Sequence, residues 1–161
     1  PEIRSVLDVG CGPGRYMIEF LLQGKEVTGL DLAPGMIEIA KGEIGNIQHK
    51  GKADFVVSDY LQHNFDKKFD AACLMGFFDY IEKPEEIFEK LKKDVTKEIY
   101  ASFPHDTGIL AMQRKFRYYL RNCPLYYYTL EDVKRILKNT GLDKNYEIKD
   151  FKRDYFVKIT L

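Results

Sequence analysis

Ser5-Val6-Leu7-Asp8-Val9-Gly10-Cys11-Gly12-Pro13-Gly14 is the stretch that decides the fold of this chain. A short apolar run contains the acidic Asp8, and three glycines follow at alternate positions before a helix-like segment at 15–22. A strand, a glycine turn and a helix in this order form a cleft for a nucleotide-like ligand at the carboxyl end of the strand. Glycine suits the turn because a side chain would keep the ligand away from the backbone, and because such turns use positive φ.

The spacing of the three glycines distinguishes two kinds of nucleotide site. Dinucleotide-binding folds place the third glycine one position later, in a GxGxxG pattern, where this chain has Arg15. The fit is therefore to GxGxG. An NAD-dependent oxidoreductase stays open as an alternative because it can use the same strand, turn and acidic residue, but no tyrosine here has a lysine four residues later. A plain tight connection between a strand and a helix is the structural alternative.

The composition fits one domain with no general attraction to polyanions. The 161 residues are enough for one sizeable core, and 25 acidic residues balance 25 basic ones, so we expect no nucleic-acid partner. The cysteines are odd in number and far apart, which favours free thiols in a reducing compartment over a disulfide framework or a zinc site. No apolar run approaches the roughly 20 residues of a membrane span. We expect a cytoplasmic protein without a membrane or metal partner.

Strand-like and helix-like patterns alternate along the chain, which predicts βαβ units and a mainly parallel sheet. The predicted strands are 5–9, 25–30, 54–58, 69–74 and 98–103, and two more, 146–151 and 155–161, are joined closely enough to form an antiparallel hairpin. The predicted helices are 15–22, one that begins at Pro34, 85–93, 108–121 and one from the Thr129 cap to Gly141. The stretch 42–52 is predicted as a loop or a short helix.

The order of these motifs resembles the class I S-adenosylmethionine-dependent methyltransferases, over nearly the whole chain. Three anchors carry the resemblance: the motif at 6–14, Asp31 at the end of the second strand, and Ser58-Asp59 after the third. It implies a Rossmann-like, seven-stranded, mainly parallel sheet with helices on both faces, in a single domain over 1–161. The chain enters its first strand about five residues after Pro1, so we expect a piece of a longer protein that lacks the usual N-terminal helical segment.

In that family the first motif carries the methionine part of the cofactor S-adenosyl-L-methionine, the acid after strand two binds the ribose hydroxyls, and the acid after strand three lies beside the adenine amino group. A carboxylate that accepts two hydrogen bonds can grip a diol, so the role of Asp31 also makes physical sense alone. Asp8 is placed to orient the turn or to meet the cationic amino group. The predicted cofactor-binding residues are Asp8, Gly10, Cys11, Gly12, Gly14, Tyr16, Asp31, Leu32, Met36, Ser58, Asp59, Tyr60, Met75 and Gly76.

Each of these roles has a structural alternative. Asp59 can simply cap a turn, and Met36 can belong to the core face of its helix with Ile37 and Ala40 instead of flanking the adenine with Leu32. Glycine at position 76 would allow a close approach of the backbone to the ligand.

The substrate side is predicted from the ends of strands four and five. Phe77 follows strand four, where the family lines the pocket between cofactor and substrate, although adjacent phenylalanines are also ordinary core residues. His105 could act as a general base or be a plain loop histidine. A lid-like helical insertion at about 105–128 could offer guanidinium groups and an aromatic face to the substrate, while a charge stripe is usually a solvated face. The remaining predicted substrate-binding residues are Arg114, Arg117, Arg121 and Tyr127.

The resemblance predicts methyl transfer to a small-molecule acceptor, and the stripe of Arg114, Arg117 and Arg121 favours O-methylation over N- or C-methylation. The cofactor's sulfonium makes the methyl group electrophilic, so alignment and exclusion of water matter more than a strong acid–base pair. A module that binds S-adenosylmethionine without catalysis is a further alternative. Methylation of nucleic acid is disfavoured because no Asn-Pro-Pro-aromatic tetrapeptide follows strand four and no Pro-Cys pair occurs.

Overall fold

The computed structural model describes residues 2–105 and 125–161. Its strands are β1 (Ser5–Val9), β2 (Glu26–Asp31), β3 (Lys52–Val57), β4 (Phe69–Leu74), β5 (Val95–Pro104), β6 (Tyr146–Asp150) and β7 (Asp154–Thr160). Its helices are α1 (Arg15–Leu22), α2 (Pro34–Gly45), α3 (Pro84–Asp94), α5 (Leu130–Asn139) and the short 3₁₀ helix η1 (Phe78–Tyr80).

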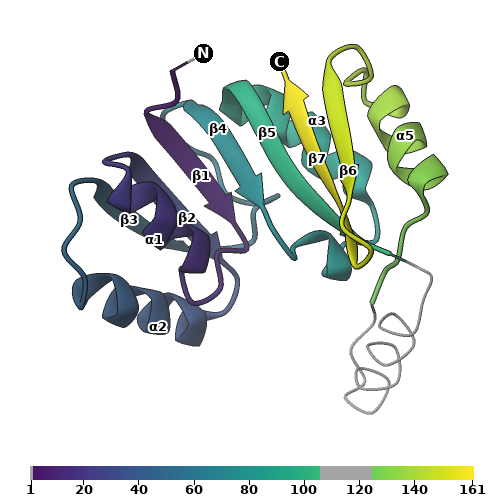
Figure 1. Ribbon diagram of the computed structural model, residues 1–161. Helices are drawn as coiled ribbons and strands as arrows, with labels where there is room; N and C mark the ends of the chain where they lie inside the picture. The colour runs from purple at the N-terminus through teal and green to yellow at the C-terminus, as the bar shows by residue number, and fades with distance from the viewer. Residues whose placement is uncertain (1, 106–124) are drawn as a thin grey trace.

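The strands form one seven-stranded sheet in the order β3-β2-β1-β4-β5-β7-β6 (Figure 1). Strands β1 to β5 run parallel to one another, while β7 pairs antiparallel with both β5 and β6. The last two strands therefore form the expected hairpin. The predicted Rossmann-like sheet, mainly parallel with an antiparallel C-terminal pair, is confirmed.

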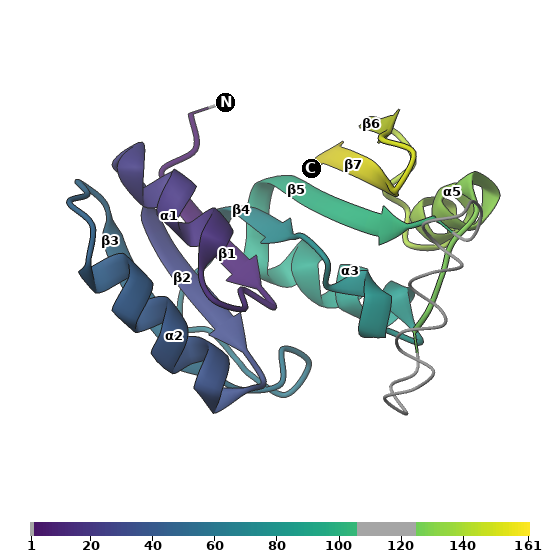
Figure 2. The same cartoon turned by 60° about the horizontal axis from the view of Figure 1, so that its bottom comes forward.

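The helices lie on both faces of the sheet (Figure 2). Alternation along β1 assigns the faces, because successive side chains of a strand point to opposite sides. Val6 packs in a cluster with the apolar side chains of α1 and α2, whereas Leu7 packs in a second cluster with those of α3 and α5. Both faces of β1 are thus buried, which explains why its sequence is apolar throughout except at Asp8.

Three stacked phenylalanine rings lie beneath the carboxyl end of the sheet. The ring of Phe78, from η1, is 4.4 Å from that of Phe103 in β5 and 5.4 Å from that of Phe88 in α3, measured between centroids. All three side chains are fully buried. The stack fixes the backbone that follows β4, because η1 begins four residues after that strand ends. Phe78 is therefore a core residue.

The second helix is longer than the sequence pattern indicated. The stretch 42–52 was predicted as a loop or a short helix, but α2 continues to Gly45 and only the residues after it are irregular. Ile44 is buried with Ile37 and Ala40, and this contact with the sheet stabilises the last turn despite the glycines. The predicted helix 108–121 lies outside the described residues.

Candidate functional site

The candidate site lies at the carboxyl ends of the parallel strands, where the strand order reverses. From β1 the chain proceeds outward through β2 and β3, and from β4 it proceeds the other way. Such a switch point leaves a crevice between the loops that follow the two central strands. The glycine turn follows β1, and the segment from Met75 to η1 follows β4. The fold therefore brings the two stretches that the sequence singled out to one place.

Three residues of the glycine turn have a left-handed backbone conformation. Gly10, Gly12 and Gly14 have φ values of 69°, 52° and 81°. A Cβ atom at Gly10 would lie 2.7 Å from the Phe77 ring, and one at Gly14 would lie 3.1 Å from Cβ of Ala40. A Cβ atom at Gly12 would meet nothing within 4 Å. Gly10 and Gly14 are thus required by packing, while Gly12 leaves the backbone open on the side where a ligand can approach.

Asp31 ties the glycine turn to the end of β2. The backbone N–H of Gly12 donates to its Oδ2 at 2.8 Å, and the N–H of Ala33 donates to its Oδ1 at 2.9 Å. Each carboxylate oxygen can accept a further hydrogen bond. The carboxylate therefore shapes the turn in the chain itself and can still receive two hydroxyl groups, a structural contribution that the sequence pattern did not reveal.

A cavity of about 410 Å³ opens between the two loops. It brings together most of the predicted residues of the second, third and fourth strand ends. Its lining consists of Gly10, Leu30, Asp31, Leu32, Ser58, Asp59, Tyr60, Leu61, Gly76, Phe77, Tyr80, Ile81 and Ile87. Sequence reasoning did not find Leu61, Ile81 and Ile87 because they look like ordinary apolar residues until the loops are folded.

Leu32 lines this cavity, whereas Met36, near the start of α2, is not among its lining residues. Leu32 is 71% exposed and Met36 is 41% exposed. The interpretation of Met36 as part of the core face of α2 is wrong, since the buried side chains of that helix are Ile37, Ala40 and Ile44. An exposed apolar side chain at the edge of the cavity, such as that of Leu32, is suited to flank a planar ring, and the predicted contact of Met36 stays a prediction.

The residues after β3 contribute a turn and a wall. Oδ1 of Asp59 accepts from the N–H of Leu61 at 2.9 Å, so the carboxylate does cap a turn, and it also lines the cavity. Tyr60 is buried, and its hydroxyl donates to Asp94 at 2.9 Å. Tyr60 therefore presents carbon atoms to the cavity while its hydroxyl belongs to a contact with α3. The predicted cofactor contact of Tyr60 stays a prediction, limited to its ring.

Gly76 is positioned by a residue of the neighbouring strand. Its φ is 71°, no atom lies within 4 Å of an added Cβ, and its N–H donates to Oγ of Ser102 at 2.8 Å. The hydroxyl of Ser102 thus holds the start of the loop after β4. Sequence reasoning noted Ser102 only as part of a strand end, and its spacing gave no signal of this contact.

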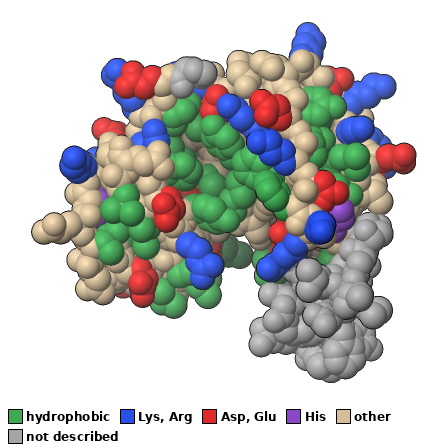
Figure 3. Space-filling view, in the orientation of Figure 1, with side chains coloured by type: hydrophobic (Ala, Val, Ile, Leu, Met, Phe, Trp, Pro, Cys, Tyr) green, Lys and Arg blue, Asp and Glu red, His purple; other side chains and the backbone are tan. Residues whose placement is uncertain are grey.

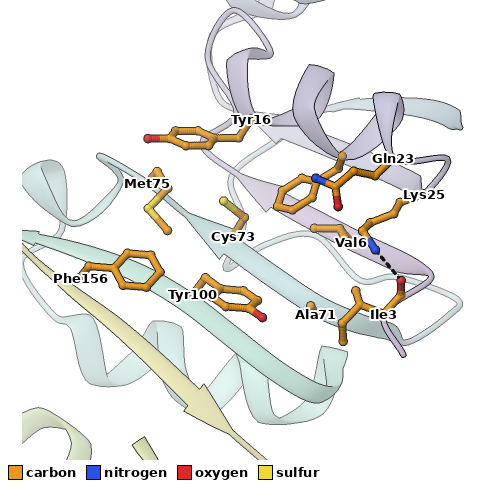
Figure 4. Close-up of a pocket in the computed structure, with 11 residues that line it drawn as sticks. Ile3, Val6, Tyr16, Gln23, Lys25, Ala71, Cys73, Met75, Tyr100 and Phe156 are labelled. Carbon is orange, nitrogen blue, oxygen red and sulfur yellow. Dashed lines mark hydrogen bonds between the residues drawn. The ribbon is translucent and has the colours of Figure 1, made fainter. Parts of the chain in front are cut away.

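A second depression lies on the sheet face that carries α1, over β4, β5 and β7. Apolar side chains gather across the middle of this face (Figure 3). The groove has a volume of about 360 Å³. Tyr16 and Met75 lie at one end, Ile3 at the other, and Cys73 between them (Figure 4). Its end at Tyr16 is next to the glycine turn, so Tyr16 and Met75 adjoin the site from this face.

Asp8 is a buried acidic residue of β1, just before the glycine turn. Its side chain is 1% exposed, and burial together with the nearby Asp31 raises its pKa to about 7. Burial also raises the pKa of the neighbouring thiols, to about 12 for Cys11 and well above its usual range for Cys73. The thiols are therefore neutral at physiological pH, and Asp8 is the group here whose charge can change.

His105 is engaged by the C-terminal hairpin. Its Nε2 lies 3.0 Å from Oδ1 of Asp150, and its ring stacks on Tyr155 with centroids 3.9 Å apart. It follows β5 at the carboxyl edge, as expected, but it does not line the cavity beside the glycine turn. A carboxylate partner can orient a histidine base or simply anchor a loop, and the catalytic role stays a prediction.

The other predicted substrate residues are only partly described. Phe77 lines the cavity with its ring against Gly10. Tyr127 is half-buried in the segment that precedes α5, and this segment is joined to η1 through the N–H of Tyr126, which donates to the Asp79 carbonyl at 2.9 Å. Arg114, Arg117 and Arg121, together with most of the expected lid at 105–128, lie outside the described residues.

Comparisons with known proteins place these features in a family. The family model described as "Methyltransferase domain" matches residues 6–98. Malonyl-[acyl-carrier protein] O-methyltransferase 1 of Ilyobacter polytropus is 29% identical over 54% of this chain and 32% of its own length. Magnesium-protoporphyrin O-methyltransferase of Rhodobacter capsulatus is 33% identical over 47% of this chain and 29% of its own. The chain thus spans about a third of the length of these curated relatives.

Solved structures show the same fold. Magnesium protoporphyrin IX methyltransferase from Synechocystis, crystallised with bound SAH, superposes with a TM-score of 0.78 at 19% identity, covering 99% of this chain and 74% of that one. A methyltransferase from Methanosarcina mazei gives 0.79 at 17% identity, covering 99% and 93%. Within residues 2–105 and 125–161, no helix combines the length and apolar character needed to cross a membrane.

The family match includes all three anchors that carried the resemblance, from the glycine turn through Asp31 to Asp59. The assignment made from the sequence is confirmed: the chain belongs to the methyltransferase-domain family.

Proposed function

We propose that this chain forms the cofactor-binding domain of an S-adenosylmethionine-dependent methyltransferase that acts on a small molecule. The observation that carries the proposal is the cavity beside the glycine turn, which gathers Gly10, Asp31, Asp59 and Gly76 from four strand ends. A turn with an open backbone, a carboxylate for a diol and a second carboxylate for an amine fit an adenosine with a charged tail.

The residues present fit the cofactor on three counts. The backbone at Gly12 is open, since an added Cβ would meet nothing within 4 Å. The cavity volume of about 410 Å³ is within the range of ligand sites of this kind. The buried carboxyl of Asp8, whose Oδ2 has no hydrogen-bond partner among the described residues, suits a cationic amino group. We assign the ribose to Asp31, the adenine to Asp59 with Leu32 and Met36, and the methionine part to the glycine turn with Asp8.

The bound cofactor supplies an electrophilic methyl group on a sulfonium. The chain's own contribution is to bind, orient and exclude water. Asp31 and the turn fix the position of the ligand, and Phe77 and Met75 supply apolar walls beside it. His105, held by Asp150, is proposed as the group that takes a proton from the acceptor.

The acceptor is proposed to be a small molecule methylated on oxygen. Support comes from relatives named as O-methyltransferases, which act on an acyl-carrier-protein-linked malonyl group and on a magnesium protoporphyrin. The predicted arginines at 114, 117 and 121 would suit an anionic acceptor. We also propose a cytoplasmic location, because Cys11 and Cys73 are free thiols.

Calorimetric titration with S-adenosylhomocysteine, and separately with NAD, tests the cofactor assignment. We expect S-adenosylhomocysteine to bind with one site per chain and NAD to give no heat, because the turn lacks the third glycine of a dinucleotide site. Binding of NAD alone would refute the proposal. Methyl transfer to a pool of metabolites then separates an enzyme from a module that only binds the cofactor.

Replacing Gly12 by alanine is expected to weaken S-adenosylhomocysteine binding at least tenfold while the chain stays folded. The added methyl group would meet no protein atom, so its cost in stability is limited to the φ of 52°, about 1 kcal/mol, yet it would occupy the space that the ligand needs. Gly42→Ala is the matched control, since Gly42 also has open space but lies inside α2 at ordinary helical φ. Equal affinities for the two variants, measured by calorimetry, would place the ligand elsewhere.

A further inference from the structure

Asp8 lies beneath the first turn of α1, on the face of the sheet that carries α1. In register with it are Gly29 of β2 and Cys73 of β4, which share this face. Because Gly29 has no side chain, the side chains of Met17 and Cys11 pack over it. A Cβ atom at Gly29 would overlap the sulfur of Met17 and lie 3.0 Å from the sulfur of Cys11. Thioether, thiol and strand backbone therefore surround the carboxyl and shield it from water.

The groups that face this carboxyl come from every neighbouring element, and their charges are neutral or negative. Asp31 from β2 is an anion, and the thiols of Cys73 from β4 and Cys11 from the turn are neutral. From α1 come the phenol of Tyr16, whose pKa is raised, mainly by burial, and the backbone N–H of Met17. The Met17 N–H and the Cys73 thiol act as hydrogen-bond donors to the carboxyl and favour its ionised form, but they do not offset burial and Asp31.

One oxygen of this carboxyl is left without a partner. Oδ2 of Asp8 is buried and has no hydrogen-bond partner among the described residues. A buried polar atom of this kind is costly unless something outside the chain satisfies it. The carboxyl belongs to the strand that leads into the glycine turn, so a cation that occupies the turn would come close to a buried acid that can become its counter-ion.

We propose that binding of S-adenosylmethionine or S-adenosylhomocysteine at the glycine turn is coupled to release of a proton from Asp8. In the chain without ligand, burial and the nearby Asp31 keep the carboxyl mainly protonated below pH 7. When the ligand's ammonium group binds, the O–H bond of the carboxyl breaks and the proton passes to water. The resulting carboxylate forms an ion pair with the ammonium group, so the oxygen that had no partner gains one. This proposal rests on the proposed function and adds a proton to its binding equilibrium.

The coupling makes affinity depend on pH in a defined direction. The pKa of Asp8 in the free chain is about 7, and an adjacent ammonium lowers it in the complex. Affinity should therefore rise as pH increases to neutrality and level off above it, by about tenfold between pH 6 and pH 8. A permanently ionised Asp8 would give no change over this interval.

Calorimetry of the whole chain with S-adenosylhomocysteine, in two buffers of different ionisation enthalpy, measures the proton directly. At pH 7 we expect release of about half a proton per ligand, rising toward one near pH 6 and falling toward zero above pH 8. Asp8→Asn should remove both the proton release and the tenfold pH dependence. Asp54→Asn is the matched control, because Asp54 lies on the surface in weak contacts with lysines. This variant should show the same proton release and the same pH dependence of affinity as the natural chain.

The possible outcomes distinguish failure of the proton coupling from failure of the proposed function. Tight binding without proton release in the natural chain would overturn the coupling and leave the cofactor assignment intact. Proton release that persists in Asp8→Asn would also overturn it, because another group would then be the donor. Failure of S-adenosylhomocysteine to bind at any pH would instead refute the proposed function. The measurement on the natural chain does not depend on the variant's ability to fold.

Discussion

Replacing Asp31 by alanine is expected to weaken S-adenosylhomocysteine binding by a factor of about 100 to 10,000. The change removes a carboxylate that can receive two hydroxyl groups, and charge-assisted hydrogen bonds contribute about 1.5–3 kcal/mol each. It also leaves the N–H groups of Gly12 and Ala33 without their acceptors, so the glycine turn loses its attachment to β2. The measurement is a calorimetric dissociation constant at constant pH.

The two contributions can be separated by a second ligand. The 2′-deoxy analogue of S-adenosylhomocysteine lacks one of the hydroxyl groups assigned to Asp31, so it should bind more weakly than the parent compound to the natural chain. In Asp31→Ala the two ligands should bind equally, because the acceptor is gone. If the variant still discriminates between them, Asp31 holds the turn but does not contact the ribose.

Replacing Asp8 by asparagine is expected to stabilise the ligand-free chain at alkaline pH. The pKa of Asp8 rises from the ordinary 3.8 to about 7 on folding, so the natural fold is favoured by protonation. This contribution is fully present below about pH 4 and is lost as pH rises to 7, because the carboxyl of the unfolded chain ionises over this interval while the buried one stays protonated. The amide stays neutral throughout. The variant's free energy of unfolding relative to the natural chain should therefore increase by up to about 4 kcal/mol between pH 4 and pH 8.

Denaturant unfolding of both chains at several pH values checks this expectation. Comparing the difference across pH cancels any constant cost of placing an amide in the pocket. A difference that does not vary with pH would show that Asp8 ionises as readily in the folded chain as in the unfolded one. If the expectation holds, Asp8→Asn gains stability at alkaline pH and loses ligand affinity, as expected where a buried acid is retained for binding.

Much of the fold, and the meeting of Asp31, Asp59 and Gly76 at one cavity, could be predicted from the sequence because local physics determines the strand ends; the contacts of these residues with the cofactor stay predictions. The glycines at 10, 12 and 14 occupy positions where positive φ is required, and an acid at the end of a buried strand has few reasons to be there other than polar contact. Asp31 and Asp59 were therefore found without a structure. The length of α2 was not, because tertiary contact through Ile44 overrides the weak helix propensity of its glycines.

Other features depend on which loops meet and could not be predicted from spacing. Nothing in the sequence indicates that the Ser102 hydroxyl holds Gly76, or that the hydroxyl of Tyr60 turns to Asp94. The exposure of Met36 follows from how α2 approaches the sheet, which periodicity leaves ambiguous by one position along the helix. The raised pKa of Asp8 likewise follows from the packing of Met17 and Cys11 over Gly29.

The close approach of Phe77 to Gly10 has a consequence for how such a site can diversify. The Phe77 ring lies so close to Gly10 that a Cβ atom there would overlap it. The glycine turn and the loop after β4 are therefore packed directly against each other. A larger or smaller side chain at position 77 would therefore also displace Gly10 and the glycine turn. The segment 125–128 makes no such contact with Gly10 among the described residues, so its side chains can change without displacing the glycine turn.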